Sequence, residues 1–145
     1  MGIIAWTDIE TTGINEWQND VVEIAFVLTS ASRLTVIARR TWIIQPPDVE
    51  ACIAKMRVDD AGKPDDYVFR MHTENGLIDA LLAGEGVPIH QAQEEIVAFL
   101  KAHSPGRPGL IPMGGSGVER FESRWFEAKL PMVKEALHYW GYDIG

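Results

Sequence analysis

Residues 3–13 read IIAWTDIETTG, an apolar run that ends in two acids and a threonine–glycine turn. Residues 3–8 predict a buried strand, followed by a turn at Thr11, Thr12 and Gly13. Because side chains alternate along a strand, Asp8 and Glu10 point to the same face. Two carboxylates placed together repel each other and lose hydration, and the usual compensation is a bound cation. The stretch therefore predicts an acidic site at the end of a buried strand, where active sites of α/β sheets form.

The acidic pair favours Mg²⁺ or Mn²⁺, because both ions prefer hard oxygen ligands. Two such ions, about 3.5–4 Å apart, can activate a water and stabilise the leaving oxygen in phosphodiester cleavage. The alternative is an ordinary strand end with two solvated acids, since the bare pattern Asp-x-Glu is common.

Composition limits the classes of protein that fit the chain. The 145 residues are 46% hydrophobic, which predicts one domain over residues 1–145 with a real core. No apolar run is long enough for a membrane helix, and the single cysteine, Cys52, excludes an internal disulfide, so we expect a cytoplasmic protein. A net charge of −8 disfavours a grip on phosphates by bulk electrostatics, but it is compatible with carboxylates that hold phosphate through metal ions.

The remaining elements predict an α/β protein with a mixed sheet. Residues 20–29 and 33–44 predict two strands that pair antiparallel, because only a short connection separates them. Further along the chain we expect helices over 49–58, 74–83, 88–103 and 117–130 and a short one after Pro131, with strands over 110–113 and near 138–144.

Several stretches resemble one family. Residues 6–14, WTDIETTGI, are similar to the first motif of the DnaQ-like (DEDD) 3′→5′ exonucleases, Asp-x-Glu-x-Thr-Gly-Leu. Residues 21–25 and 137–144 resemble two of the family's strands, and residues 71–77, MHTENGL, resemble a stretch characteristic of oligoribonucleases. The resemblance implies an RNase H-like mixed sheet, with three antiparallel N-terminal strands, then parallel strands, and helices at its flanks.

The second motif of that family places an Asp on a helix after a glycine turn. Here the turn at 115–117 is followed by FESRWF at 121–126, and the aligned acid is Glu122. The resemblance thus implies that Asp8, Glu10 and Glu122 are catalytic and bind two Mg²⁺ or Mn²⁺ ions, with looser geometry because Glu is one methylene longer. A solvated acid at the flank of the helix is the alternative for Glu122, and Glu119 is its nearest rival.

The third motif, a His or Tyr followed by an Asp on a late helix, has no match. All four histidines precede the last predicted strand or lie within it. By this resemblance, the chain is truncated at its C-terminal end, or the missing part comes from elsewhere, or the protein is not catalytic as it stands. Asp143, within that strand, is expected to give support at most.

The same resemblance implies substrate contacts at Thr11, Gly13, Ile14, His72 and Ser116. A packed residue is the alternative for Ile14, and a surface histidine at a helix start is the alternative for His72. A glycine turn with serine is common, so Ser116 need not bind phosphate.

Trp17 lies among polar residues after the turn. It either stacks on a base or caps the core.

Two functions from different classes fit the sequence. One is a metal-dependent 3′→5′ exonuclease that acts on the 3′ end of single-stranded DNA or short RNA and releases nucleoside 5′-monophosphates. The other is a non-catalytic RNase H-like module that binds nucleic acid or a protein, which the change to Glu and the missing third motif favour. An acidic α/β interaction domain is a third, generic interpretation. A homodimer is left open, since oligoribonuclease-like relatives form dimers.

Overall fold

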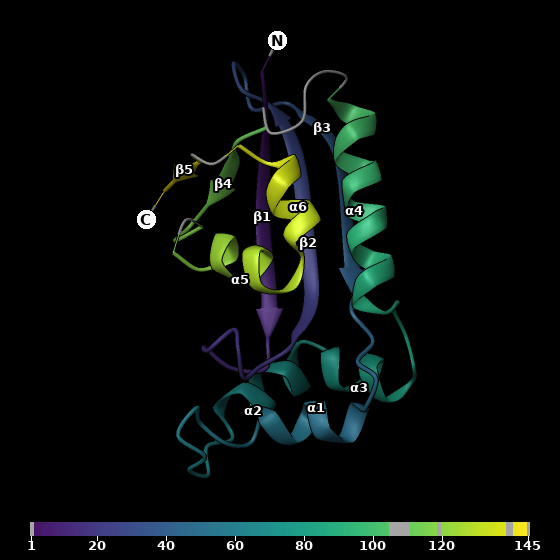
Figure 1. The fold of residues 1–145 in the computed structure, drawn as a ribbon, viewed down its shortest axis with the longest axis vertical. Helices are drawn as coiled ribbons and strands as arrows, with labels where there is room; N and C mark the ends of the chain where they lie inside the picture. The colour runs from purple at the N-terminus through teal and green to yellow at the C-terminus, as the bar shows by residue number, and fades with distance from the viewer. Residues whose placement is uncertain (1, 105–110, 119, 139–140, 145) are drawn as a thin grey trace.

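A mixed sheet forms the centre of the computed structural model, which describes residues 2–104, 111–118, 120–138 and 141–144 (Figure 1). Its strand order is β3-β2-β1-β4-β5. The strands are β1 (Ile3–Thr11), β2 (Val21–Ser30), β3 (Val36–Ile43), β4 (Met113–Gly115) and β5 (Tyr142–Asp143). β1, β2 and β3 are antiparallel, whereas β4 is parallel to β1 and β5 to β4. The predicted mixed α/β sheet is confirmed.

Helices cover one face of this sheet and gather at one of its ends. In Figure 1, α4, α5 and α6 lie in front of the strands, and α1, α2 and α3 lie below the point where β1 ends. Their bounds are α1 (Val49–Lys55), α2 (Tyr67–Glu74), α3 (Leu77–Leu82), α4 (Ile89–His103), α5 (Glu122–Lys129) and α6 (Pro131–Ala136). None of the described helices combines the length and the apolar character that a membrane-spanning segment requires.

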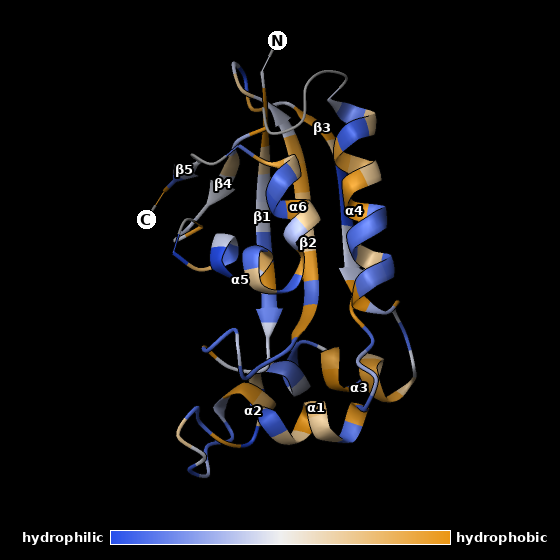
Figure 2. Cartoon of the chain, viewed as in Figure 1, coloured by the Kyte–Doolittle hydropathy of each residue, from blue (hydrophilic) through white to orange (hydrophobic). Residues whose placement is uncertain are grey.

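The core lies between the sheet and helices α4 to α6. Apolar residues that alternate along β1 and β2, such as Ile9 and Phe26, pack against Leu100, Trp125 and Phe126. A second, smaller cluster joins α1 and α3 to the lower end of β2 and β3. In Figure 2, β2 is largely orange, whereas the end of β1 turns blue. β1 is therefore an apolar strand with a polar end.

Several predicted boundaries were wrong. The helix predicted over 74–83 corresponds to α3, which begins only at Leu77 because Gly76 adopts a φ of 86°. Glu74 instead ends α2, which begins at Tyr67, before the predicted helix. The helix predicted from residue 117 begins only at Glu122, because the chain turns at Gly117, whose φ is 65°. The first strand continues past Asp8 to Thr11, and the third begins at Val36.

Other expectations concern residues outside the described ones. The rival acid Glu119 lies there, as do Leu110 of the predicted fourth strand and residues 139–140 of the predicted last strand.

Candidate active site

Three acids share one face of the sheet at the end of β1. Asp8 and Glu10 are two residues apart in β1, and the antiparallel register places Glu23 of β2 directly opposite Glu10. Residues opposite each other in neighbouring strands lie on the same face. The intervening residue Ile9 points to the other face and is buried in the core. The register of β1 and β2 thus adds a third carboxylate to the predicted pair.

Asp8 influences each of the other acids. Burial raises the pKa of Asp8, although its side chain keeps contact with solvent, and the backbone N–H of Ile9 lowers this pKa in part. Burial likewise raises the pKa of Glu10 and of Glu23, and repulsion from the charge of Asp8 raises both further. The carboxylates are therefore close enough to disfavour one another's ionisation.

Glu122 reaches this group from another part of the chain. It is the first residue of α5 and is only 4% exposed, and its Oε1 has no hydrogen-bond partner among the described atoms. Burial raises the pKa of Glu122, and the charges of Asp8 and Asp143 raise it further. Hydrogen bonds from backbone N–H groups, including that of Ile9, lower this pKa in part. We refer to Asp8, Glu10, Glu23 and Glu122 as the acid cluster.

The short strand β4 and the turn after it bring Glu122 to β1. β4 pairs with β1 only at Ala5 and Trp6, so the acid-bearing end of β1 extends beyond it. Gly115 runs close to β1, since a Cβ there would meet the carbonyl oxygen of Thr7 at 3.0 Å. The chain then turns, and Asp143 of β5 accepts a 2.9 Å hydrogen bond from the backbone N–H of Gly117. Asp143 thus supports the turn that leads into α5.

The chemistry of the acid cluster fits a hard divalent cation. Its donors are carboxylate oxygens, one of them buried without a partner, and their mutual repulsion is the kind of cost that a cation relieves. As the side chains stand, however, no group of three or more His, Cys, Asp or Glu residues among those described is close enough to hold a metal ion. Holding one would require side-chain rearrangement.

His72 supports the end of β1 from below. The ring is fully buried, Nε2 lies 2.8 Å from the carbonyl oxygen of Thr11, and Nδ1 lies 3.1 Å from Nδ2 of Asn75. Asn75 Oδ1 accepts from the N–H of Leu77, which orients its amide group toward the ring as a donor. A carbonyl only accepts, so these contacts assign the proton to Nε2. His72 is therefore a buried structural partner of β1, not the surface histidine that the sequence left as an alternative.

A small cavity lies directly beside Glu10. Its volume is about 230 Å³, and Thr11, Gly13 and Ile14 line it together with Val68, Met71 and Phe121. The hydroxyl of Thr11 donates a 2.6 Å hydrogen bond to the carbonyl oxygen of Gly13, which closes the turn. Three of the predicted substrate contacts thus surround one cavity, whereas His72 lies behind its wall and Ser116 lies in the turn before α5.

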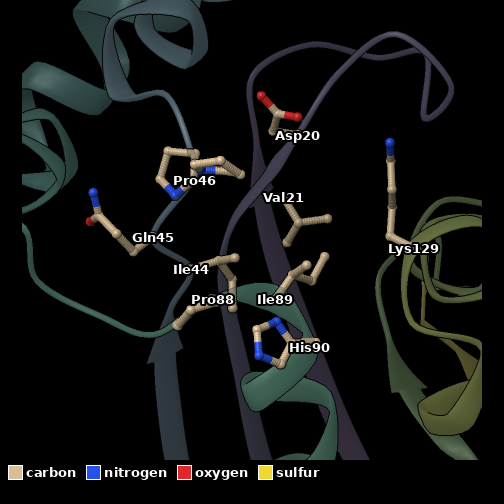
Figure 3. Close-up of a pocket in the computed structure, with 10 residues that line it drawn as sticks. Asp20, Val21, Ile44, Gln45, Pro46, Pro88, Ile89, His90 and Lys129 are labelled. Atoms are coloured by element: carbon tan, nitrogen blue, oxygen red, sulfur yellow. The ribbon is translucent and has the colours of Figure 1, made fainter.

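A larger cavity, of about 450 Å³, lies away from the acid cluster. Figure 3 shows Ile44, Pro46 and Pro88 on its wall. Its one carboxylate, Asp20, is already paired with Lys55 at 3.1 Å. This cavity is the larger of the two, but the smaller one borders Glu10 of the acid cluster and is therefore the better candidate for catalysis.

Sequence reasoning missed Glu23. The signal was present in the alternation of residues 21–25, VVEIA, where a lone acid interrupts an apolar strand. Only the pairing of β2 with β1 reveals that this acid faces Glu10.

The fold and the acids at the end of its central strand define an RNase H-like α/β domain. E. coli exonuclease I, solved in complex with an oligonucleotide, has a similar fold, with a TM-score of 0.60 over 86% of this chain and 23% of that one, at 15% identity. Its product-bound structure matches equally, with a TM-score of 0.60.

Sequence relatives narrow the class. The oligoribonuclease of Corynebacterium diphtheriae is 28% identical over 142 residues, 97% of this chain and 61% of that protein. The oligoribonuclease of Shewanella loihica is 29% identical over 143 residues, 97% of this chain and 70% of that protein. No protein-family model matches the sequence. The chain is therefore similar to oligoribonucleases over almost its whole length, and it spans about 60–70% of the length of these relatives.

Proposed function

We propose that this chain is the acid-bearing part of a metal-dependent 3′→5′ exonuclease. Its substrate would be the 3′ end of single-stranded DNA or short RNA, and its products nucleoside 5′-monophosphates. One observation supports this most directly: a buried glutamate on α5, with an unpartnered oxygen, lies close enough to Asp8 for repulsion to raise its pKa. A fold alone would not require a charged side chain at that buried position.

The acid cluster would hold two divalent cations through Asp8, Glu10 and Glu122. Such ions, when bound, polarise a water and neutralise charge on the leaving oxygen of a phosphodiester. Glu23, opposite Glu10, would add negative charge that strengthens cation binding. The protein's own contribution is position, since β1 and the start of α5 fix the carboxylates from two directions.

The cavity beside Glu10 would receive the terminal nucleotide. Ile14, Val68 and Met71 give it apolar walls, which suit the face of a base. The turn at Thr11 and Gly13 would approach the nucleotide closely, because both residues line the cavity. The general base that would take a proton from the attacking water is not assigned among these 145 residues.

Mn²⁺ titration tests the proposal on the chain itself. We expect calorimetry to detect Mn²⁺ binding in the wild type and to find it weakened at least tenfold by Asp8→Asn. Glu127→Gln provides a matched control, because Glu127 is exposed on the same helix as Glu122 and should leave the affinity unchanged. Equal Mn²⁺ affinity in the wild type and the Asp8 variant would refute the metal site.

The alternative is a non-catalytic RNase H-like binding module. Its specific support is that the described carboxylates do not form a ready-made metal cage. A 5′-labelled oligonucleotide separates the two functions, since only an exonuclease shortens it from the 3′ end in the presence of Mn²⁺. This assay uses a version with the full length of the relatives, and loss of activity in Asp8→Asn ties it to the acid cluster.

A further inference from the structure

The turn that follows β1 is held by hydrogen bonds within itself. The carbonyl oxygen of Asn15 accepts 3.1 Å bonds from the N–H groups of Gln18 and Asn19. The side chain of Asn15 accepts a 2.9 Å bond from the N–H of Trp17. We refer to residues 13–19 as the β1 turn. Its backbone makes one helical turn from Asn15 to Asn19.

A second loop anchors the β1 turn from below. The carboxylate of Asp60 accepts hydrogen bonds from the N–H of Asn15 at 2.7 Å and from Nδ2 of Asn19 at 2.9 Å. Oδ1 of Asn19 accepts in turn from the hydroxyl of Thr12 at 2.9 Å. These bonds leave the turn little freedom to move relative to the end of β1.

Helix α5 anchors the β1 turn from the other side. Nε of Arg124 lies 2.8 Å from the carboxylate of Glu16, and its Nη2 donates to the carbonyl oxygen of Ile14 at 3.3 Å. Arg124 is two residues after Glu122, so the same helical turn supplies both a buried acid and a clamp on the β1 turn. The position of the turn is thus coupled to that of the acid cluster.

This anchored turn holds two large apolar side chains in water. Ile14 is 72% exposed and Trp17 is 74% exposed, and they are three residues apart. Ile14 also lines the cavity beside Glu10. A single exposed apolar residue needs no explanation, but an exposed indole on an anchored turn that also carries a residue of the cavity wall is a preorganised contact surface. The sequence left open whether Trp17 caps the core, and its exposure excludes that role.

We propose that Trp17 stacks on the nucleobase next to the terminal one in a bound single strand. The inference rests on the proposed function, because it takes the terminal nucleotide to lie in the cavity beside Glu10. Bulk charge cannot supply affinity for nucleic acid here, since the chain carries a net charge of −8. Stacking on an aromatic side chain can supply this affinity, and it tolerates any base because every base has a π-face. Trp17 therefore contributes to affinity for strands longer than one nucleotide.

Binding of two probes tests the inference on the 145-residue chain, with Ca²⁺ present to leave the probes intact. The probes are a 5′-labelled pentathymidylate, followed by anisotropy, and thymidine 5′-monophosphate, followed by competition with it. Trp17→Leu keeps apolar volume but removes the ring, and we expect pentanucleotide affinity to fall about tenfold. Trp17→Phe keeps a ring and should stay within about threefold of the wild type. Neither variant should change the affinity for the mononucleotide.

The control is Leu82→Ala, at a 62% exposed residue on α3, which should leave both affinities unchanged. Equal pentanucleotide affinity in Trp17→Leu and the wild type overturns the stacking role but leaves the proposed function standing. Equal losses for both probes, or equal weakening by Phe and Leu, also overturn it, because they indicate a general structural effect. A wild type that binds neither probe overturns both proposals, and dimers that Trp17→Leu dissociates would assign the side chain to a protein interface instead.

Discussion

Replacing Glu122 by Gln tests two effects of its charge separately: the loss of stability in the metal-free chain and the binding of a metal ion. The substitution keeps the length of the side chain and an acceptor oxygen, and it removes the negative charge. Glu122 is 4% exposed, and its Oε1 has no hydrogen-bond partner among the described atoms. A buried polar group left without a partner costs about 1–3 kcal/mol, and a charged one costs more. We therefore expect Glu122→Gln to stabilise the metal-free chain at pH 7 by about 1 kcal/mol.

Thermal unfolding measures this effect directly. For a chain of this length, 1 kcal/mol corresponds to a rise in Tm of about 3–4 °C. Added Mn²⁺ should reverse the order of the two proteins. At about 100 times its Kd, a ligand that binds only the folded state stabilises it by about 2.7 kcal/mol, and we expect most of this gain in the wild type alone.

Two results would refute this reasoning. One is a Glu122→Gln variant that is less stable than the wild type in metal-free buffer at pH 7, which would mean that the charge is already compensated. The other is an equal Mn²⁺-induced rise in Tm for both proteins, which would place the metal elsewhere. Glu127→Gln, exposed on the same helix, should match the wild type under both conditions.

Three further predictions follow from neighbouring contacts. Because the pKa of Glu122 is raised in the folded state, its ionisation destabilises the fold progressively from about pH 4.5, the unfolded value, up to the raised pKa, and by a constant amount above it. Urea titration at each pH should therefore show the advantage of Glu122→Gln absent below about pH 4.5, growing over that range and level above it. Gly13→Ala should lower the free energy of unfolding by about 1–3 kcal/mol, since its Cβ would lie 2.6 Å from the buried amide of Asn19, and an unchanged urea midpoint would contradict this. His72→Phe should lower the free energy of unfolding by about 1–3 kcal/mol, because it leaves the carbonyl of Thr11 unpaired. His72→Gln retains a donor, so the same urea titration should show a smaller decrease.

Much of the local structure was predictable from short-range patterns. The shared face of Asp8 and Glu10 follows from the two-residue period of a strand, and α4 begins and ends within one residue of its predicted bounds. Errors arose where local signals competed. The pattern of 74–83 predicts one helix that includes Gly76, but the positive φ of this glycine separates α2 from α3. The apolar spacing from Val118 onward suggested a longer helix, yet Gly117 turns the chain and delays α5 to Glu122.

What the sequence by itself determined was the class of fold, the acidic pair and the family resemblance, because each depends on neighbouring residues and their order. Only the tertiary structure decided that Glu23 faces Glu10, since strand register depends on the pairing of two distant segments. It also decided that Glu122 approaches Asp8 and that His72 is buried beneath Thr11. Such contacts join segments far apart in the chain, and the local periodicity of each segment does not predict which residues of the two segments meet.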